Sequence, residues 1–142
     1  MSGFAKKRRL SREFAFKFLY QRGDSSGEAG SDFESFVTNT PEDELPEDSE
    51  FARELACGVC REIKEIDSLI GGVSVNWAVG RMSPVDVNIM RVAVYEMVYM
   101  DDIDRASSIN EAVEMAKKYG AEKSAGFVNG VLDKIGAERK DG

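Results

Sequence analysis

The chain contains no histidine, so it lacks the residue that most often acts as a general base in enzymes. No run of apolar residues approaches the ~18 that are needed to cross a bilayer. The basic start of the chain is not followed by the apolar stretch that a secretory signal requires. These absences predict a cytoplasmic protein that has no membrane segment.

Cysteine is also scarce, because the chain has only Cys57 and Cys60. A structural zinc site normally takes about four nitrogen or sulfur ligands, and two thiolates without imidazole fall short of that. The acidic cluster Asp101, Asp102 and Asp104 superficially resembles a metal site, but a hydrated loop between helices is the simpler interpretation. We therefore expect reduced thiols, no metal and no cofactor.

The motifs of common enzyme classes are missing as well. No phosphate-binding glycine loop, dinucleotide fingerprint or nucleophile elbow is present. Carboxylates are plentiful, but most fall on expected linkers or on the polar faces of expected helices. The sequence therefore predicts a protein without catalytic residues.

Positive charge is concentrated at the start of the chain. The first 22 residues hold seven cations and one anion, whereas the whole chain has a net charge of −7. A cationic block on an anionic chain is typical of a site that binds a polyanion. Charges beyond about 8 Å are screened at physiological salt, so this block can outweigh distant acids. The candidate phosphate-binding residues are Lys6, Lys7, Arg8, Arg9 and Arg12.

The basic block leads into an expected helix. Leu10, Phe14 and Phe18 recur at helical spacing, which predicts a helix from about Leu10 to Gly23 behind a basic arm at residues 1–9. If the arm is helical, Arg8 and Arg12 share a face; if it is extended, all its cations can follow a phosphate backbone. Tyr20 offers a ring to a ligand, and a place at the rim of the core explains it too.

Helical periodicity continues through nearly the whole chain, and no segment shows the alternation of a strand. We expect one all-α domain, residues 1–142, with about six or seven helices. Residues 41–49 hold two prolines and five acids, which predicts an acidic linker. Apolar residues from Phe51 to Ile70 predict a single long helix that ends at Gly71 and Gly72.

Capping signals and special residues refine this outline. Ser83 and Pro84 form a strong helix start, and Ser108 with Glu111 has the spacing of a capping box. Gly136 is expected at the end of the last helix. We expect Trp77 to lie in the core and Gly130 to lie at a close contact between helices. Phe127 is expected to be either buried or stacked on a base.

Five segments, taken in order, carry a resemblance to a known family. They are residues 11–20 (SREFAFKFLY), 51–55 (FAREL), 89–96 (IMRVAVYE), 109–117 (INEAVEMAK) and 127–135 (FVNGVLDKI). In this pattern the chain resembles the NusB transcription antitermination family. The resemblance spans almost the whole chain, but residues 24–49 match only in their loose helical character.

The resemblance implies an all-helical, NusB-like fold of two packed subdomains without catalysis. It implies binding of single-stranded boxA RNA and docking of NusE, a small-subunit ribosomal protein. The complex would join RNA polymerase and other Nus factors and support ribosomal RNA synthesis. RNA contacts map to the basic arm, Tyr20 and Phe127, and a protein-partner contact maps to Asp86. Lys6, Lys7 and Lys123 depart from the family pattern.

Two alternatives share part of this evidence. Ribosomal-RNA cytosine methyltransferases carry a similar RNA-gripping domain at their start, although a chain that ends at Gly142 is too short to add the catalytic domain. A pure protein-interaction module could use the basic arm to bind an acidic partner. A homodimer also stays open, because an apolar helix face can serve a core or an interface.

Overall fold

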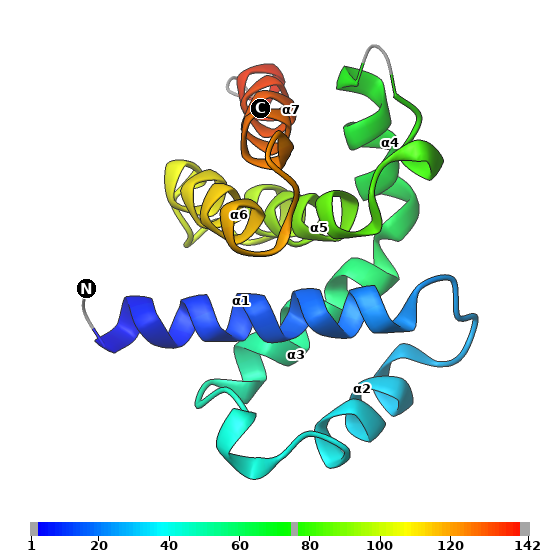
Figure 1. Cartoon of the computed structure of the whole chain (residues 1–142), viewed down its shortest axis with the longest axis vertical. Helices are drawn as coiled ribbons and strands as arrows, with labels where there is room; N and C mark the ends of the chain where they lie inside the picture. Colours follow the sequence, from blue (N-terminus) through cyan, green and yellow to red (C-terminus); the bar gives the residue numbers. More distant parts are fainter. Residues whose placement is uncertain (1–2, 75–76, 140–142) are drawn as a thin grey trace. The chain divides into compact units, whose positions relative to one another are not determined.

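The computed structural model describes residues 3–74 and 77–139, and within these ranges it has seven α-helices, two 3-10 helices and no strand (Figure 1). The chain divides into two compact units, Met1–Arg61 and Glu62–Gly142. The expected all-α class is confirmed. No helix in the described ranges is long and apolar enough to span a membrane. The first two residues of the expected arm, and Gly142, lie outside the described residues.

The first unit contains three α-helices and one short 3-10 helix. They are α1 (Gly3–Arg22), α2 (Ala29–Thr38), η1 (Glu42–Glu44) and α3 (Ser49–Arg61). Helix α1 contacts both α2 and α3, and α2 contacts α3 (Figure 1). The long basic helix is therefore held along one side by the rest of its unit.

Four phenylalanine rings join α1 to α2. Phe14 and Phe18 of α1 meet Phe33 and Phe36 of α2, with ring centroids 4.9 to 5.9 Å apart. Most of these pairs are edge-to-face, the arrangement that the ring quadrupoles favour. Such pairs add about 1 kcal/mol each beyond the burial of area, so the cluster fixes the C-terminal half of α1.

Helix α1 begins earlier than the apolar pattern predicted. It starts at Gly3, so the described basic residues lie within its first turns and not in an extended arm. It ends as expected at Gly23, whose φ of 55° is the left-handed value that favours glycine after a helix. Leu10 was wrongly placed in the apolar stripe, because it is 43% exposed and the buried face passes through Ser11, Phe14 and Phe18.

The acidic segment after α2 is tied down at its end. The Ser11 hydroxyl of α1 donates a hydrogen bond to the Asp48 carbonyl at 2.8 Å. The Asp48 carboxylate accepts from the backbone N–H of Phe51 at 3.1 Å, which caps the start of α3. This segment therefore anchors α1 and α3 to each other as well as connecting α2 to α3.

The single helix that we expected from Phe51 to Ile70 is broken. Glu62 leaves the helical region at φ −104° and ψ 19°, and the chain resumes as α4 (Ile63–Val73). The buried residues of α3 pack in the first unit, whereas α4 contacts α5 and α7 of the second. Periodicity does not reveal this change of partner. Gly71 and Gly72 also lie inside α4, which continues to Val73.

The second unit is built from α4, η2 (Val79–Arg81), α5 (Pro84–Tyr99), α6 (Arg105–Tyr119) and α7 (Ser124–Glu138). Helix α7 contacts α4, α5 and α6, and α5 contacts α4 and α6 (Figure 1). The core between them is aliphatic, and its largest fully buried side chains include Ile66, Ile70, Ile89, Met90, Leu132 and Ile135.

Polar side chains fix the start of α5 and one of its sides. The predicted start is confirmed, because Ser83 accepts a hydrogen bond from the Asp86 N–H at 3.2 Å and Pro84 opens the helix. Farther along, Arg91 grips the Asp67 carboxylate of α4 with two hydrogen bonds of 2.8 Å. This two-pronged pair holds α4 against α5 in a fixed register.

The predicted capping role of Ser108 is wrong. Helix α6 begins four residues earlier than a cap at Ser108 would place it, and the Asp104 carboxylate accepts from the Ser107 N–H at 3.2 Å. Ser108 is buried instead, and its hydroxyl donates to Oε1 of the fully buried Glu96 on α5 at 2.7 Å. A buried carboxylate requires such partners, since water cannot reach it.

We expect Ser108→Ala to lower the free energy of unfolding by about 2 kcal/mol, because it removes a hydrogen bond between two buried side chains. Ser107→Ala is the matched control. Ser107 is exposed, and its hydroxyl lies 3.3 Å from the Asp104 carboxylate, so its loss should cost less than about 0.5 kcal/mol. Urea unfolding of both variants measures the difference; equal losses would show that the buried bond contributes nothing.

Two further expectations about single residues are wrong. Trp77 is 52% exposed, so it does not fill the core. Helix α7 runs past Gly136 to Glu138. The absence of a side chain at Gly136 leaves room for the Arg105 side chain, because an added Cβ would lie 3.1 Å from the Arg105 Cδ. Arg105 also donates a hydrogen bond to the Gly136 carbonyl at 2.7 Å.

Candidate nucleic-acid interface

The first cations of α1 are open to solvent. Lys6 and Lys7 are both exposed. The Lys7 ammonium lies 3.3 Å from a Glu47 carboxylate oxygen, but these side chains are 51% and 73% exposed. An ion pair this exposed contributes little and exchanges readily for a phosphate. The acidic segment therefore does not mask the positive charge of these two lysines.

Arg8 is held in place by aromatic rings. Its guanidinium carbon lies 3.9 Å from the centre of the Phe51 ring and 4.9 Å from that of Phe4. Its Nε is buried and has no hydrogen-bond partner among the described residues. Cation–π stacking orients the planar guanidinium before any ligand arrives, which lowers the entropy lost on binding.

The other two predicted arginines are less accessible. Arg9 is half-buried, and Arg12 is only 7% exposed. The Arg12 guanidinium carbon lies 5.7 Å from the centre of the Phe51 ring, so Phe51 has Arg8 and Arg12 as neighbours. Arg12 is therefore mainly part of the first unit's packing, and Lys6, Lys7, Arg8 and Arg9 remain the candidate ligand-binding group.

One exposed stripe runs the length of α1. Lys6, Leu10, Lys17 and Gln21 are all exposed, and their spacing of 4, 11 and 15 residues from the first keeps them on one side of the helix. Tyr20 is 53% exposed next to this stripe, with its ring 6.3 Å from that of Phe16. Lys17 was absent from the predicted site, although its spacing from Lys6 could have identified it.

The remaining predicted residues belong to the second unit. Phe127 lies half-buried in the first turn of α7, so its ring is partly available to a ligand. Asp86 lies half-buried in the first turn of α5, and its Oδ1 is buried without a hydrogen-bond partner among the described residues. A carboxylate at a helix N-terminus is stabilised by the helix dipole.

Among the described side chains, no group of three or more histidine, cysteine, aspartate or glutamate residues could hold a metal ion. Cys57 and Cys60 are free thiols. Burial raises the pKa of the Cys57 thiol, which keeps it protonated and weakens it as a nucleophile. The chemistry offered by α1 is therefore that of binding: fixed cations, a stacked guanidinium and an exposed phenol ring.

Comparison with known proteins agrees with this arrangement. The family model described as the NusB family matches residues 9–137. The chain belongs to the NusB family. It is 43% identical to the transcription antitermination protein NusB of Geobacter sulfurreducens, over 94% of this chain and 96% of that protein. Its identity to the Syntrophomonas wolfei NusB is 44%, over 93% and 97% of the two chains.

Solved NusB structures share the fold. The structure of T. maritima NusB is 34% identical and superimposes with a TM-score of 0.79, covering 92% of this chain and 91% of that one. A structure of the antitermination factors NusB and NusE in complex with dsRNA is 29% identical, with a TM-score of 0.77 and coverage of 94% and 98%. The expected NusB-like architecture is confirmed.

Proposed function

We propose that this chain is a transcription antitermination factor that binds single-stranded boxA RNA through α1 and docks the ribosomal protein NusE. In this role it joins RNA polymerase and other Nus factors and supports ribosomal RNA synthesis. One observation carries the proposal: lysines and arginines are mounted on a rigid helix, and the lysines remain exposed despite the acidic segment beside them.

Affinity comes from the phosphates. Each phosphate that a lysine or arginine neutralises releases condensed counterions, and for single strands the logarithmic salt slope is about −0.7 per contact. The guanidinium of Arg8 is already oriented by stacking on Phe51, so it loses less conformational entropy when it binds a phosphate. The rigid helix presents these charges at fixed spacing, which an unstructured tail does not.

Unpaired bases suit the rest of the surface. An A-form duplex keeps its bases stacked, whereas a single strand exposes base faces and edges to rings and polar groups. Tyr20 offers such a ring at 53% exposure, and Phe127 is partly accessible. The solved relative is described with dsRNA, so a duplex of the same sequence is the natural competitor in a binding assay.

The protein partner requires a second surface. Asp86 is half-buried in the first turn of α5, so the exposed part of its side chain is available to a hydrogen-bond donor from NusE. If RNA and NusE bind the same molecule and favour each other, the coupling is reciprocal. An adaptor of this kind needs no catalytic group of its own.

Titration of labelled boxA RNA, with and without NusE, tests the proposal. We expect boxA to bind more tightly than a scrambled strand of equal length, and NusE to tighten it further at two salt concentrations. Equal affinity for both strands would indicate a general polyanion binder. Unchanged affinity upon addition of NusE would contradict the adaptor role.

A further inference from the structure

A hollow lies where the C-terminal end of α1 meets α2. It encloses about 410 Å³, which falls within the range of about 300 to 1,000 Å³ typical of small-ligand sites. Both apolar and polar groups line it, among them Phe18, Gln21, Asp32, Ser35, Phe36 and Asn39. It belongs entirely to the first unit, and Gln21 is the one residue of the exposed stripe of α1 that lines it.

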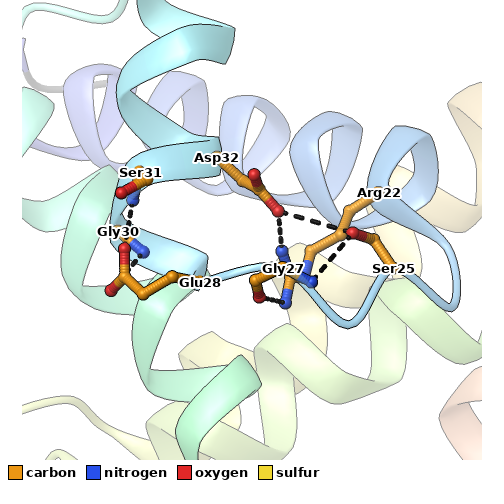
Figure 2. A network of polar contacts seen from close by, with 7 residues as sticks. All are labelled: Arg22, Ser25, Gly27, Glu28, Gly30, Ser31 and Asp32. Atoms are coloured by element: carbon orange, nitrogen blue, oxygen red, sulfur yellow. Dashed lines mark hydrogen bonds and ion pairs between the residues drawn. The ribbon is translucent and has the colours of Figure 1, made fainter.

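A polar network holds the loop between α1 and α2, beside the hollow (Figure 2). Arg22 at the end of α1 pairs with the Asp32 carboxylate and donates to the Gly27 carbonyl at 2.8 Å. Glu28 caps α2 by accepting from the Ser31 N–H at 2.6 Å and the Gly30 N–H at 3.1 Å. These bonds, led by that from Ser31, lower the pKa of Glu28. The loop between α1 and α2 is thus built before any ligand binds.

The network also decides which chemistry the hollow accepts. The positive charge of Arg22 is neutralised by Asp32, and a phosphate would meet the Asp32 carboxylate as a like charge. The hydrogen bonds that Arg22 and Ser25 donate to that carboxylate both go to Oδ2. Oδ1 remains able to accept hydrogen bonds, since an ionised carboxylate is an acceptor only. A neutral ligand rich in N–H donors fits better than an anion.

The opposite surfaces suit a flat ring. The half-buried Phe36 gives the hollow an apolar face on which a ring can stack, and the amides of Gln21 and Asn39 can each donate and accept. Guanine combines a stacking face with two kinds of N–H donor on one edge and a carbonyl acceptor beside them. Its edge can therefore donate to the Asp32 carboxylate and accept from one of the amides.

The hollow is continuous with the exposed stripe of α1. Gln21 lines the hollow and is also the last residue of the exposed stripe that begins at Lys6 and includes Lys17. Fifteen residues of helix separate Lys6 from Gln21, or about 22 Å along the axis. A strand held by the phosphate-binding end of α1 can therefore reach the hollow by following one side of the helix.

We propose that this hollow is a base-binding subsite that takes one unpaired guanine of the RNA strand held along α1. The proposal rests on the proposed function, because it assumes that α1 binds RNA. It adds a position of base selectivity, set by Asp32 and Asn39, to a helix that otherwise grips phosphates.

A short uridine-only strand and a series in which one guanosine is moved along it test the subsite. With the unaltered protein, we expect guanosine at one position to tighten binding by about tenfold, the effect of one stacked and hydrogen-bonded base. Inosine, which lacks the exocyclic amine, should recover only part of this gain, and adenosine less.

Two variants assign the gain to the hollow. Ser35→Tyr fills it, whereas Thr38→Tyr places the same ring on an exposed position of α2 that does not line it. We expect the guanosine gain to vanish in Ser35→Tyr and in Asn39→Leu and to persist in Thr38→Tyr, with the uridine strand binding equally to all. Helical content measured by circular dichroism confirms that each variant folds.

The outcomes separate the two proposals. If the uridine strand binds but no guanosine position gains affinity, or if the gain survives in Ser35→Tyr, the subsite is refuted while RNA binding by α1 stands. If no strand binds to the unaltered protein, both proposals are refuted. A loss of NusE binding in Ser35→Tyr without any effect on RNA would assign the hollow to the protein partner and overturn the subsite.

Discussion

The double substitution Lys6→Glu and Lys7→Glu is expected to weaken the binding of single-stranded boxA RNA by about a hundredfold. Each lysine loses a charge-assisted contact with phosphate, worth about 1.5 kcal/mol, and each new glutamate repels the strand. Both side chains are exposed, so the fold should not change. Fluorescence anisotropy across a salt series measures the affinity, and the logarithmic salt slope should become shallower by about 1.4.

The control for this experiment carries the same change in charge elsewhere. Arg61→Glu with Lys64→Glu alters two exposed cations at the junction of α3 and α4, outside α1. We expect this variant to bind RNA within about threefold of the unaltered protein, because neither cation belongs to the proposed binding helix and exposed charges are largely screened at physiological salt. Equal weakening in both variants would mean that net charge, and not the position of the cations, determines binding.

Gly120→Ala is expected to lower the free energy of unfolding by about 3 kcal/mol. Gly120 ends α6 at φ −94°, which any residue can adopt, so the cost is steric. An added Cβ would lie 2.6 Å from the Ser124 side chain and 2.8 Å from the Ala116 carbonyl. Ser124 must then move and lose its hydrogen bond from the Ala121 N–H, so overpacking and a broken α6–α7 turn act together.

Gly130→Ala is the matched control, and we expect it to act in the opposite direction. Gly130 is exposed in the middle of α7, and a Cβ there would meet nothing within 4 Å. Our expectation of close helix packing at Gly130 was wrong. Alanine should therefore stabilise the helix by up to about 1 kcal/mol. Thermal and urea unfolding compare the two variants; a loss of stability in Gly130→Ala would contradict this assignment.

Periodicity predicted the helices that pack within a single unit. The apolar spacing of α2, α5, α6 and α7 and the Ser83 cap are seen in the structure. The pattern failed at Glu62, where the next helix packs against a different set of neighbours, because spacing records which face is buried but not what covers it. It failed at Ser108 for a related reason, since a buried partner such as Glu96 cannot be inferred from local sequence.

The sequence predicted which residues make up the candidate site better than it predicted how their side chains are arranged. The sequence identified the cluster of cations, but the helix that carries them starts at Gly3, which sorts them into exposed lysines, a stacked Arg8 and a buried Arg12. That sorting depends on Phe51, which is distant in sequence. The hollow beside Arg22 could not be foreseen either, because it depends on how the loop before α2 folds back onto α1.

Photocrosslinking of a thiouridine-labelled boxA strand, mapped by mass spectrometry, tests the central claim most directly. If the cations of α1 hold unpaired RNA, crosslinked peptides should come from residues 3–22, and the Lys6→Glu and Lys7→Glu variant should lose them. Crosslinks confined to residues outside α1, unaffected by that variant, would contradict the account.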